Sequence, residues 1–175
     1  MTSGYIDRRN LEHLLAGLMP PNREALRLSM DYGMRIGDVL AMPSSAPDKP
    51  RYTYTEEKTG KRRTVRLSEA HRASLRALRN EHWCFPHRLD PERHRCRQTV
   101  WADLKRIARA FRLKAISPHS ARKLFAVELY HRTDDIKKVQ RALNHDNVEV
   151  TALYALADQL TVSGRSTRTK RRRTN

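Results

Sequence analysis

The segment Ser117-Pro118-His119-Ser120-Ala121-Arg122-Lys123 combines a helix start with two side chains that suit an anion. Proline is favoured in the first turn of a helix, and residues three apart, such as His119 and Arg122, then share one face. Main-chain N–H groups and the helix dipole at such an end already favour an anion. Arg122 adds a planar fork that matches phosphate oxygens, and His119 adds a group that moves a proton near neutral pH. The segment therefore predicts a helical N-terminus that binds a phosphate.

Three further segments carry residue types that would complete such a site. They are residues 28–38, Leu-Ser-Met-Asp-Tyr-Gly-Met-Arg-Ile-Gly-Asp, residues 57–61, Glu-Lys-Thr-Gly-Lys, and residues 142–145, Ala-Leu-Asn-His, which Tyr154 follows nine residues later. A second arginine, a lysine and a second histidine would build a phosphate clamp with groups for proton transfer, and a tyrosine hydroxyl can act as a nucleophile. Composition alone does not bring the four segments together in space.

The pattern of apolar residues outward from these segments is mostly helical. Its spacing predicts helices that open at Asp7 or Asn10, at Asn22, at Ile36, at Ser68, near Val100, at Pro118, at Thr133 and near Val150. Residues 51–57 and 62–67 favour strands, and residues 58–61 form a turn in which Gly60 supplies the special backbone angle. We therefore expect a mainly α fold with one small antiparallel β-hairpin, of the α+β class.

The net charge identifies the kind of partner. The chain has 175 residues, with 36 Lys and Arg against 19 Asp and Glu, and a formal net charge of +17. This excess favours a polyanion, and nucleic acid is the first candidate. We find no uncharged apolar run near the roughly 20 residues that cross a bilayer, and no signal peptide. Two cysteines are too few for a disulfide framework, so we expect a soluble, cytoplasmic protein.

Part of the charge is concentrated in residues 161–175, which contain no acidic residue. Such a block buries no apolar area, so we expect it to be disordered until it meets an anion. It is either a solubilising tail or an arm that follows DNA and adds salt-dependent affinity. Its basic residues are Arg165, Arg168, Lys170, Arg171, Arg172 and Arg173.

In their order and intervals, the four segments resemble the motif series of the tyrosine recombinases, the phage-integrase family. The matching residues are Gly33-Met-Arg35-Ile-Gly-Asp38, Lys58-Thr-Gly-Lys61, Pro118-His119-Ser-Ala-Arg122, and Leu143-Asn-His145 with Tyr154. The resemblance implies a catalytic domain of that family over residues 1–160, encoded by a prokaryote, a phage or a mobile element. It implies a site-specific recombinase that cleaves and rejoins DNA without ATP, metal or other cofactor.

The resemblance also assigns roles to individual residues. Arg35 and Arg122 would grip the non-bridging oxygens of the scissile phosphate and offset the charge that builds in the transition state. Lys58 would protonate the leaving 5′ hydroxyl, and Lys61 is the alternative for this role. Asp38 would support the catalytic residues with its carboxylate without itself taking part in the reaction.

The remaining roles concern the nucleophile. Tyr154 would attack the phosphate, giving a 3′-phosphotyrosyl link and a free 5′ hydroxyl. His119 would be its general base or proton partner, and His145 a further hydrogen-bond donor to the phosphate. Double-stranded DNA would also contact Lys61, Arg62, Arg63, Lys123 and the basic residues of 161–175, and we expect a monomer that assembles into a tetramer on DNA.

The sequence departs from the family pattern in four ways. Asp38 replaces a usual Glu, Lys123 a frequent His, and Asn144 a frequent Gly, and none of these changes removes a catalytic group. Family members also commonly carry an N-terminal helical domain that closes around DNA. Here the first motif already stands at Arg35, so we expect that domain to be absent, either in a natural single-domain recombinase or in an excised catalytic fragment.

Two other functions and one other site remain alternatives. The domain could occupy DNA as a non-cleaving accessory or regulatory protein, or relax supercoils as a type IB-like topoisomerase. Residues 84–96 hold four residues of the types that bind zinc, but their spacing matches no common zinc finger, and we expect no metal there. These residues are Cys84, His87, His94 and Cys96.

Overall fold

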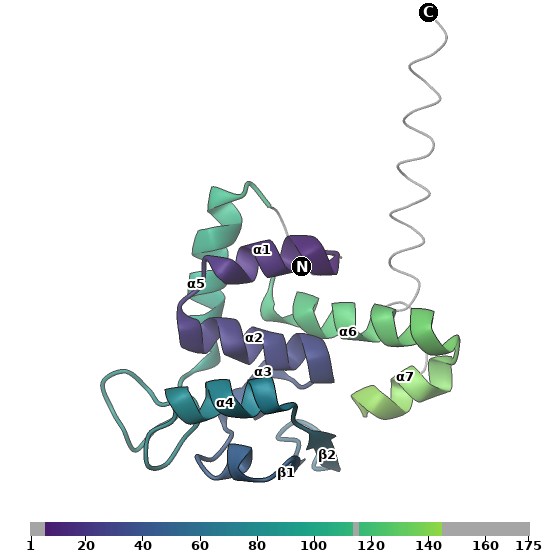
Figure 1. Cartoon of the computed structure of the whole chain (residues 1–175). Helices are drawn as coiled ribbons and strands as arrows, with labels where there is room; N and C mark the ends of the chain where they lie inside the picture. Colours follow the sequence, from purple (N-terminus) through teal and green to yellow (C-terminus); the bar gives the residue numbers. More distant parts are fainter. Residues whose placement is uncertain (1–5, 114–115, 145–175) are drawn as a thin grey trace, which may run out of the picture.

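The computed structural model describes residues 6–113 and 116–144, which form the predicted helices and hairpin (Figure 1). The helices are α1 (Arg8–Ala16), α2 (Pro20–Tyr32), α3 (Ile36–Leu40), the 3-10 turn η1 (Ala46–Asp48), α4 (Glu69–Leu78), α5 (Arg97–Ala110), α6 (Pro118–Thr133) and α7 (Ile136–Leu143). The strands are β1 (Arg51–Thr55) and β2 (Arg62–Arg66). The predicted fold class is confirmed. The helix expected near Val150 lies outside the described residues.

Three helix starts were predicted correctly from residues that lie next to them in the sequence. Asp7 caps α1 by accepting a hydrogen bond from Asn10 N at 2.9 Å, and Ser68 caps α4 through His71 N at 3.3 Å. Both caps satisfy N–H groups that have no partner inside the helix. Pro118 occupies the first turn of α6 as predicted.

Two predicted helix starts were wrong. Asn22 does not cap α2, which begins at Pro20, because its side chain is buried and donates to Asp103 of α5 at 2.8 Å. Thr133 is the last residue of α6, and α7 is capped instead by Asp135, whose carboxylate accepts from Lys138 N at 3.0 Å. At α2, a proline occupies the first helical turn instead. At α7, a carboxylate provides the cap.

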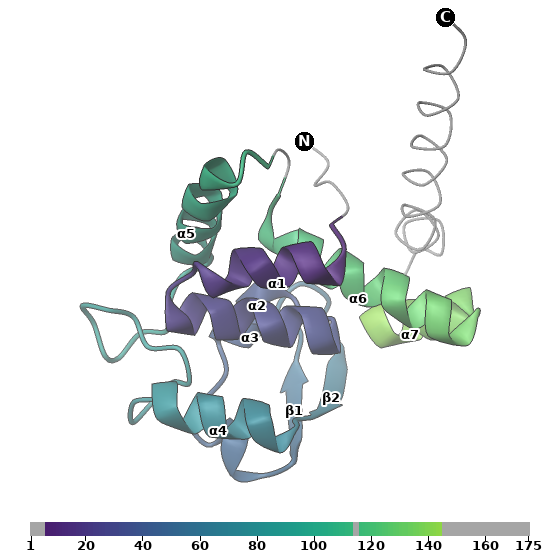
Figure 2. The same ribbon diagram turned by 45° about the horizontal axis from the view of Figure 1, so that its top comes forward.

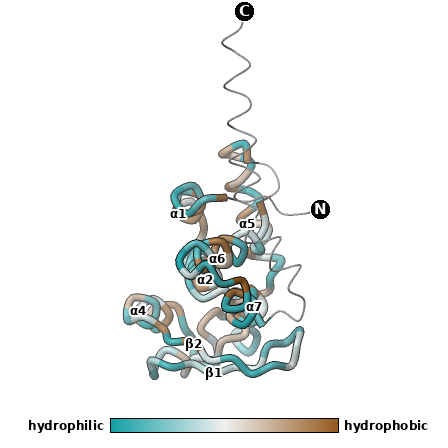
Figure 3. The backbone as a smooth tube through the Cα atoms, turned by 90° about the vertical axis from the view of Figure 1, so that its right-hand side faces the viewer, coloured by the Kyte–Doolittle hydropathy of each residue, from teal (hydrophilic) through white to brown (hydrophobic). Residues whose placement is uncertain are grey.

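The core is divided by α6, which packs along α2. The first half of α6 contributes Ala121 and Leu124 to a large cluster shared with α1 to α5 and the hairpin. Its second half contributes Ala126 and Leu129 to a smaller cluster with α7. Viewed from the α7 side, apolar segments of α2 and α6 lie between the hydrophilic outer turns (Figure 3). Among the described residues, no helix is long and apolar enough to span a bilayer.

The hairpin lies with α4 on the side of α2 opposite α1 (Figure 2). Its strands pair antiparallel with Tyr54 opposite Arg63, and the hydroxyls of Thr53 and Thr64 lie 2.7 Å apart across them. Gly60 adopts φ +65° in the turn, a left-handed angle that glycine accepts without strain. The turn of residues 56–61 therefore projects from a fixed two-stranded base.

Candidate active site

The end of α2 places the first motif. Gly33 terminates α2 with φ +62°, and a Cβ at this position would lie 2.4 Å from Cδ1 of Phe125 on α6. A glycine is therefore required both by the backbone angle and by the close packing of the two helices. The turn at Gly33 leads directly to Arg35, the residue before α3, and directs the Gly33 carbonyl toward the start of α6.

Arg122 joins three of the four predicted motifs. It lies near the start of α6, is 6% exposed, and donates from Nη1 to the Gly33 carbonyl at 2.5 Å. Its Nη2 donates to the Leu143 carbonyl at 2.6 Å, at the end of α7. The next residue, Asn144, ends α7 with φ +51°. Asparagine tolerates this left-handed angle better than most residues, which explains why it can stand where the family frequently has glycine.

The environment of Arg122 is crowded with positive charge. Burial lowers its pKa, and the nearby guanidinium groups of Arg35 and Arg63 lower it further, to about 10, against the opposing effect of Glu56. Arg122 therefore remains charged at neutral pH. An additional anion near this cluster would relieve the repulsion among the three guanidinium groups.

Arg35 is held by a carboxylate that the sequence analysis did not single out. Its Nη1 forms an ion pair with Oε2 of Glu56 at 2.6 Å, and Glu56 is fully buried. The same oxygen accepts a hydrogen bond from the Thr59 hydroxyl at 2.7 Å. Side chains alternate between the two faces of a strand, so Glu56, two positions after Tyr54, is expected to point inward as Tyr54 does. This alternation does not indicate what the Glu56 carboxylate binds.

Arg63 lies in the same cluster rather than on the outer face of the hairpin. Its Nη1 donates to the Gly33 carbonyl at 3.0 Å and to the Tyr54 hydroxyl at 3.3 Å, and its Nη2 donates to the Tyr32 carbonyl. The side chain is 11% exposed. Its donors hold the end of α2 against the hairpin, and the DNA contact expected for Arg63 stays a prediction.

His119 lies at the surface, and neighbouring positive charges affect its pKa. Partial burial lowers its pKa, and the charges of Arg122, Lys123, Lys58 and Arg35 lower it further. These four cations come from α6, from the hairpin turn and from the residue before α3, so the charges of three motifs act on the imidazole. A lowered pKa keeps His119 neutral at pH 7, the form that accepts a proton.

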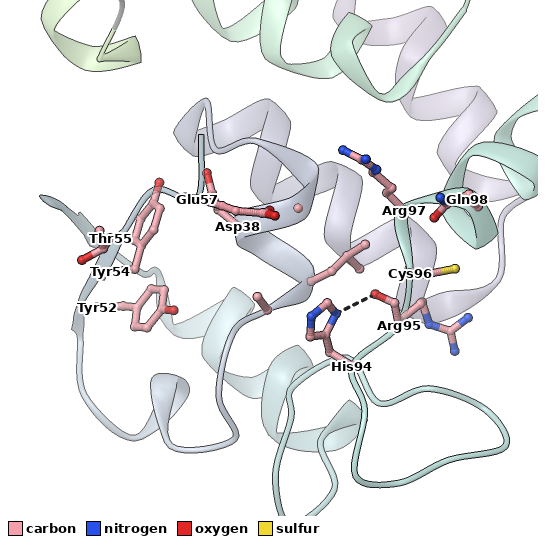
Figure 4. A pocket seen from close by; sticks show the side chains of 13 residues that line it. Asp38, Tyr52, Tyr54, Thr55, Glu57, His94, Arg95, Cys96, Arg97 and Gln98 are labelled. Atoms are coloured by element: carbon pink, nitrogen blue, oxygen red, sulfur yellow. Dashed lines mark hydrogen bonds between the residues drawn. The ribbon is translucent and has the colours of Figure 1, made fainter. Parts of the chain in front are cut away.

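Asp38 fastens the hairpin turn to α3. Its Oδ1 accepts a hydrogen bond from Glu57 N at 3.0 Å, and burial raises its pKa. Its Oδ2 is buried without a hydrogen-bond partner among the described residues, at the edge of a cavity of about 370 Å³. Figure 4 shows the Asp38 carboxylate and the Arg97 guanidinium extending toward one another across this cavity, with Tyr52 and Tyr54 forming another wall.

The other predicted residues are placed as follows. Lys58, Lys61 and Arg62 are exposed on the hairpin, and Lys123 is half-buried on α6, where burial lowers its pKa. The predicted residues outside the described part of the chain are His145, Tyr154, Arg165, Arg168, Lys170, Arg171, Arg172 and Arg173.

The four residues of the zinc-binding types are directed to other partners. The Cys84 thiol is buried and donates to the Pro43 carbonyl at 3.0 Å, whereas the Cys96 sulfur lies 3.2 Å from the Thr99 hydroxyl. His94 Nδ1 contacts the Arg95 carbonyl at 2.9 Å, and His87 Nδ1 accepts from Leu89 N at 3.3 Å. Within residues 6–113 and 116–144, no three His, Cys, Asp or Glu side chains gather as ligands for a metal ion.

Comparison with known proteins identifies the class. The phage integrase family model matches residues 5–160, and the chain belongs to this family. Tyrosine recombinase XerD of Rhizobium meliloti (strain 1021) is 33% identical over 133 residues, which are 70% of this chain and 42% of that protein. The integrase of Escherichia phage P2 is 28% identical over 153 residues, 87% of this chain and 43% of that protein. The chain thus spans less than half the length of these relatives.

Solved structures share the fold. The XerA recombinase superimposes with a TM-score of 0.72 at 16% identity, over 94% of this chain and 64% of that chain. The catalytic domain of bacteriophage HP1 integrase gives 0.63 at 18% identity, over 89% and 88%. XerH site-specific recombinase bound to difH substrate gives 0.67 at 21% identity, over 86% and 50%.

Proposed function

We propose that this chain is the catalytic portion of a site-specific DNA recombinase that cuts and rejoins strands by transesterification. The observation that carries the proposal is that Arg35 and Arg122, on elements distant in sequence, belong to one cluster. Arg63 links them, because it contacts the carboxylate that pairs with Arg35 and shares the Gly33 carbonyl with Arg122. The charges of both arginines act on His119. Family membership supports the same activity. We assign residues 1–160 to this catalytic portion.

The arginine pair suits a scissile phosphate. Two guanidinium groups near one point offer planar N–H donors to the non-bridging oxygens, and they stabilise the additional charge of the transition state. Arg122 is already fixed by the Gly33 and Leu143 carbonyls, so its guanidinium needs little reorganisation when a phosphate binds.

The proton transfers follow from charge and exposure. The Tyr154 oxygen attacks phosphorus, and the bond from phosphorus to the 5′ oxygen breaks as the new ester forms. His119, kept neutral by its lowered pKa, accepts the tyrosine proton. Lys58 on the hairpin turn donates a proton to the leaving 5′ oxygen, and His145 donates a hydrogen bond to the phosphate. The ester retains the energy of the broken bond for rejoining.

Double-stranded DNA is the proposed partner. The excess of positive charge supports it, as does the relative XerH, which was solved bound to its difH substrate. We propose that Lys61, Arg62 and Lys123 contact the DNA backbone together with the basic residues of 161–175. We further propose a monomer in solution and a tetramer on two duplexes.

Covalent trapping tests the proposal. The full chain is incubated with nicked duplexes of randomised sequence, in which the cleaved strand loses a short fragment and cannot be rejoined. Denaturing electrophoresis then separates protein–DNA adducts, whose DNA is recovered and sequenced. We expect an adduct from the wild-type chain and none from Tyr154→Phe. No adduct, or an adduct that survives Tyr154→Phe, would overturn the proposal.

A further inference from the structure

Glu56 is a buried carboxylate to which the proposed mechanism gives no task. It stands between β1 and the turn that carries Lys58, and its side chain has no exposed surface. A buried charge is costly unless it is paired, so its partners indicate what it does. Those partners are the guanidinium groups of Arg35 and Arg63 and the hydroxyl of Thr59.

One oxygen of Glu56 serves two parts of the site. Oε2 lies 2.6 Å from Arg35 Nη1 and accepts from the Thr59 hydroxyl at 2.7 Å. Arg35 belongs to the first motif, and Thr59 directly follows Lys58 in the turn. Because both contacts share one atom, any movement of the turn changes the surroundings of Arg35, and the reverse also holds.

The charge of Glu56 also suits the cluster. The guanidinium groups of Arg35 and Arg63 lie against it, with Oε1 3.8 Å from Arg63 Nη1. The third guanidinium group, that of Arg122, shares the Gly33 carbonyl with Arg63. Burial opposes ionisation of Glu56, but the Thr59 hydroxyl and the Arg35 guanidinium hold its pKa below the usual range. The carboxylate is therefore charged at neutral pH, and it reduces the repulsion that the three arginines exert on one another.

We propose that Glu56 is a positioning residue for strand cleavage, which holds the Arg35 guanidinium and the Lys58 turn at a fixed separation around one scissile phosphate. This inference rests on the proposed function. Glu56 itself does not touch DNA. Its contribution is to keep an electrostatic donor and a proton donor correctly spaced, and a misplacement of about 1 Å can lower a rate about 100-fold.

The test compares two leaving groups in single-turnover cleavage by the full chain. One duplex, recovered by the covalent trapping above, is made with a normal 5′ oxygen at the scissile phosphate. Another carries sulfur at that bridging position. A thiolate leaves without a proton, so cleavage of the sulfur duplex does not need Lys58. Glu56→Gln is compared with Glu81→Gln, which removes the same charge at an exposed position.

We expect Glu56→Gln to slow adduct formation about 100-fold on the oxygen duplex at saturating DNA, with duplex affinity changed less than about threefold, as for a charge that makes no phosphate contact. On the sulfur duplex the defect should shrink at least about tenfold, because only the Arg35 part of the role remains. Glu81→Gln should match the wild type on both. A defect of equal size on both duplexes would overturn the proposal, because a purely structural role would slow cleavage equally whichever leaving group is present.

Thr59→Val keeps the test decisive if Glu56→Gln does not fold. It removes the hydroxyl that donates to Glu56 at 2.7 Å, together with a long hydrogen bond from Lys61 N at 3.4 Å within the same turn, and it conserves side-chain shape. We expect cleavage about tenfold slower on the oxygen duplex and near wild-type on the sulfur duplex. Unchanged cleavage of the oxygen duplex would overturn the proposal. If the wild-type chain cleaves and the variants do so equally well, this inference alone fails; if the wild-type chain forms no adduct, the proposed function fails with it.

Discussion

Arg122 donates a 2.5 Å hydrogen bond to the main-chain oxygen of Gly33, which lies 89 positions earlier in the chain. The same guanidinium reaches the Leu143 carbonyl at 2.6 Å. One side chain therefore fixes the ends of α2 and α7 relative to the start of α6. The residue that we assign to the phosphate is also a structural bridge, so its loss should affect folding and chemistry together.

Arg122→Lys should be impaired in both respects. A lysine is a point charge without the planar fork, so it cannot satisfy two carbonyls and a phosphate at once. We expect adduct formation to fall about 100- to 1,000-fold, as for loss of a fixed donor to a developing charge. The Leu143 carbonyl would lose its donor, which should cost about 1–3 kcal/mol in the free energy of unfolding, whereas the Gly33 carbonyl keeps its hydrogen bond from Arg63. Single-turnover trapping and urea denaturation measure the two effects, and Arg109→Lys, at an exposed position on α5, is the control.

Gly33→Ala and Gly60→Ala form a matched pair for the packing at the end of α2. Both glycines have φ above +60°, so both substitutions carry the left-handed strain of about 1–2 kcal/mol. At Gly33 the new Cβ meets Phe125 at 2.4 Å, whereas at Gly60 no atom of the described residues lies within 4 Å. We expect Gly33→Ala to lose about 1–3 kcal/mol more than Gly60→Ala in denaturant unfolding. Equal losses would mean that α2 and α6 separate without penalty.

These contacts show what the sequence could predict. The apolar spacing, the Ser68 cap and the turn at Gly60 depend on neighbours in sequence, so the helices and the hairpin were predictable. Whether a polar side chain points outward depends on which element packs against it. Arg63 looked like one more hairpin charge and Asn22 like a cap, yet both donate hydrogen bonds to elements distant in sequence. Glu56 was missed for the same reason.

Exchange of Asn22 and Asp103 should recover part of the stability that replacement of Asn22 alone loses. Asp103 Oδ2 accepts from Asn22 Nδ2 at 2.8 Å and from Met19 N at 2.9 Å, which joins the start of α2 to α5. Asn22→Asp would bring two buried carboxylates together, and we expect it to lower the free energy of unfolding by at least about 1–3 kcal/mol. The double variant Asn22→Asp/Asp103→Asn restores one amide and one carboxylate, and should recover part of that loss. Recovery is incomplete because an amide nitrogen in place of Asp103 Oδ2 cannot accept from Met19 N. Simple additivity of the two losses would contradict a direct contact.

The stability of the protein should decrease between neutral and alkaline pH because of His71. Burial opposes its charge, but hydrogen bonds with Asp31 and Glu24, at 3.1 and 2.6 Å, raise the pKa of His71 to about 9. The folded protein therefore keeps a proton that the unfolded chain releases near pH 6.5. The resulting stabilisation is complete below pH 6.5 and is lost as the pH rises through about 9.

Urea unfolding at pH 6 and pH 9.5 measures this effect. We expect the free energy of unfolding of the wild type to fall by up to about 3 kcal/mol over this range. His71→Gln carries no titratable proton at this position, so it should be less stable at pH 6 and lose much less on going to pH 9.5. Parallel decreases in the two proteins would assign the pH dependence to other groups.

Cleavage should depend on pH through His119. Partial burial and the charges of Arg122, Lys123, Lys58 and Arg35 lower its pKa, so the neutral base is present at pH 7. On the acid side, the single-turnover rate should fall about tenfold per pH unit only below the ordinary imidazole value of about 6.5. Lys123→Met removes one of the charges that lower the pKa, and we expect the acid limb of its profile to move to higher pH, most clearly at low ionic strength. Lys137→Met, which removes an exposed charge on α7, should leave the limb in place. If both variants shift the limb equally, the general field of the protein rather than the neighbours of His119 sets its protonation.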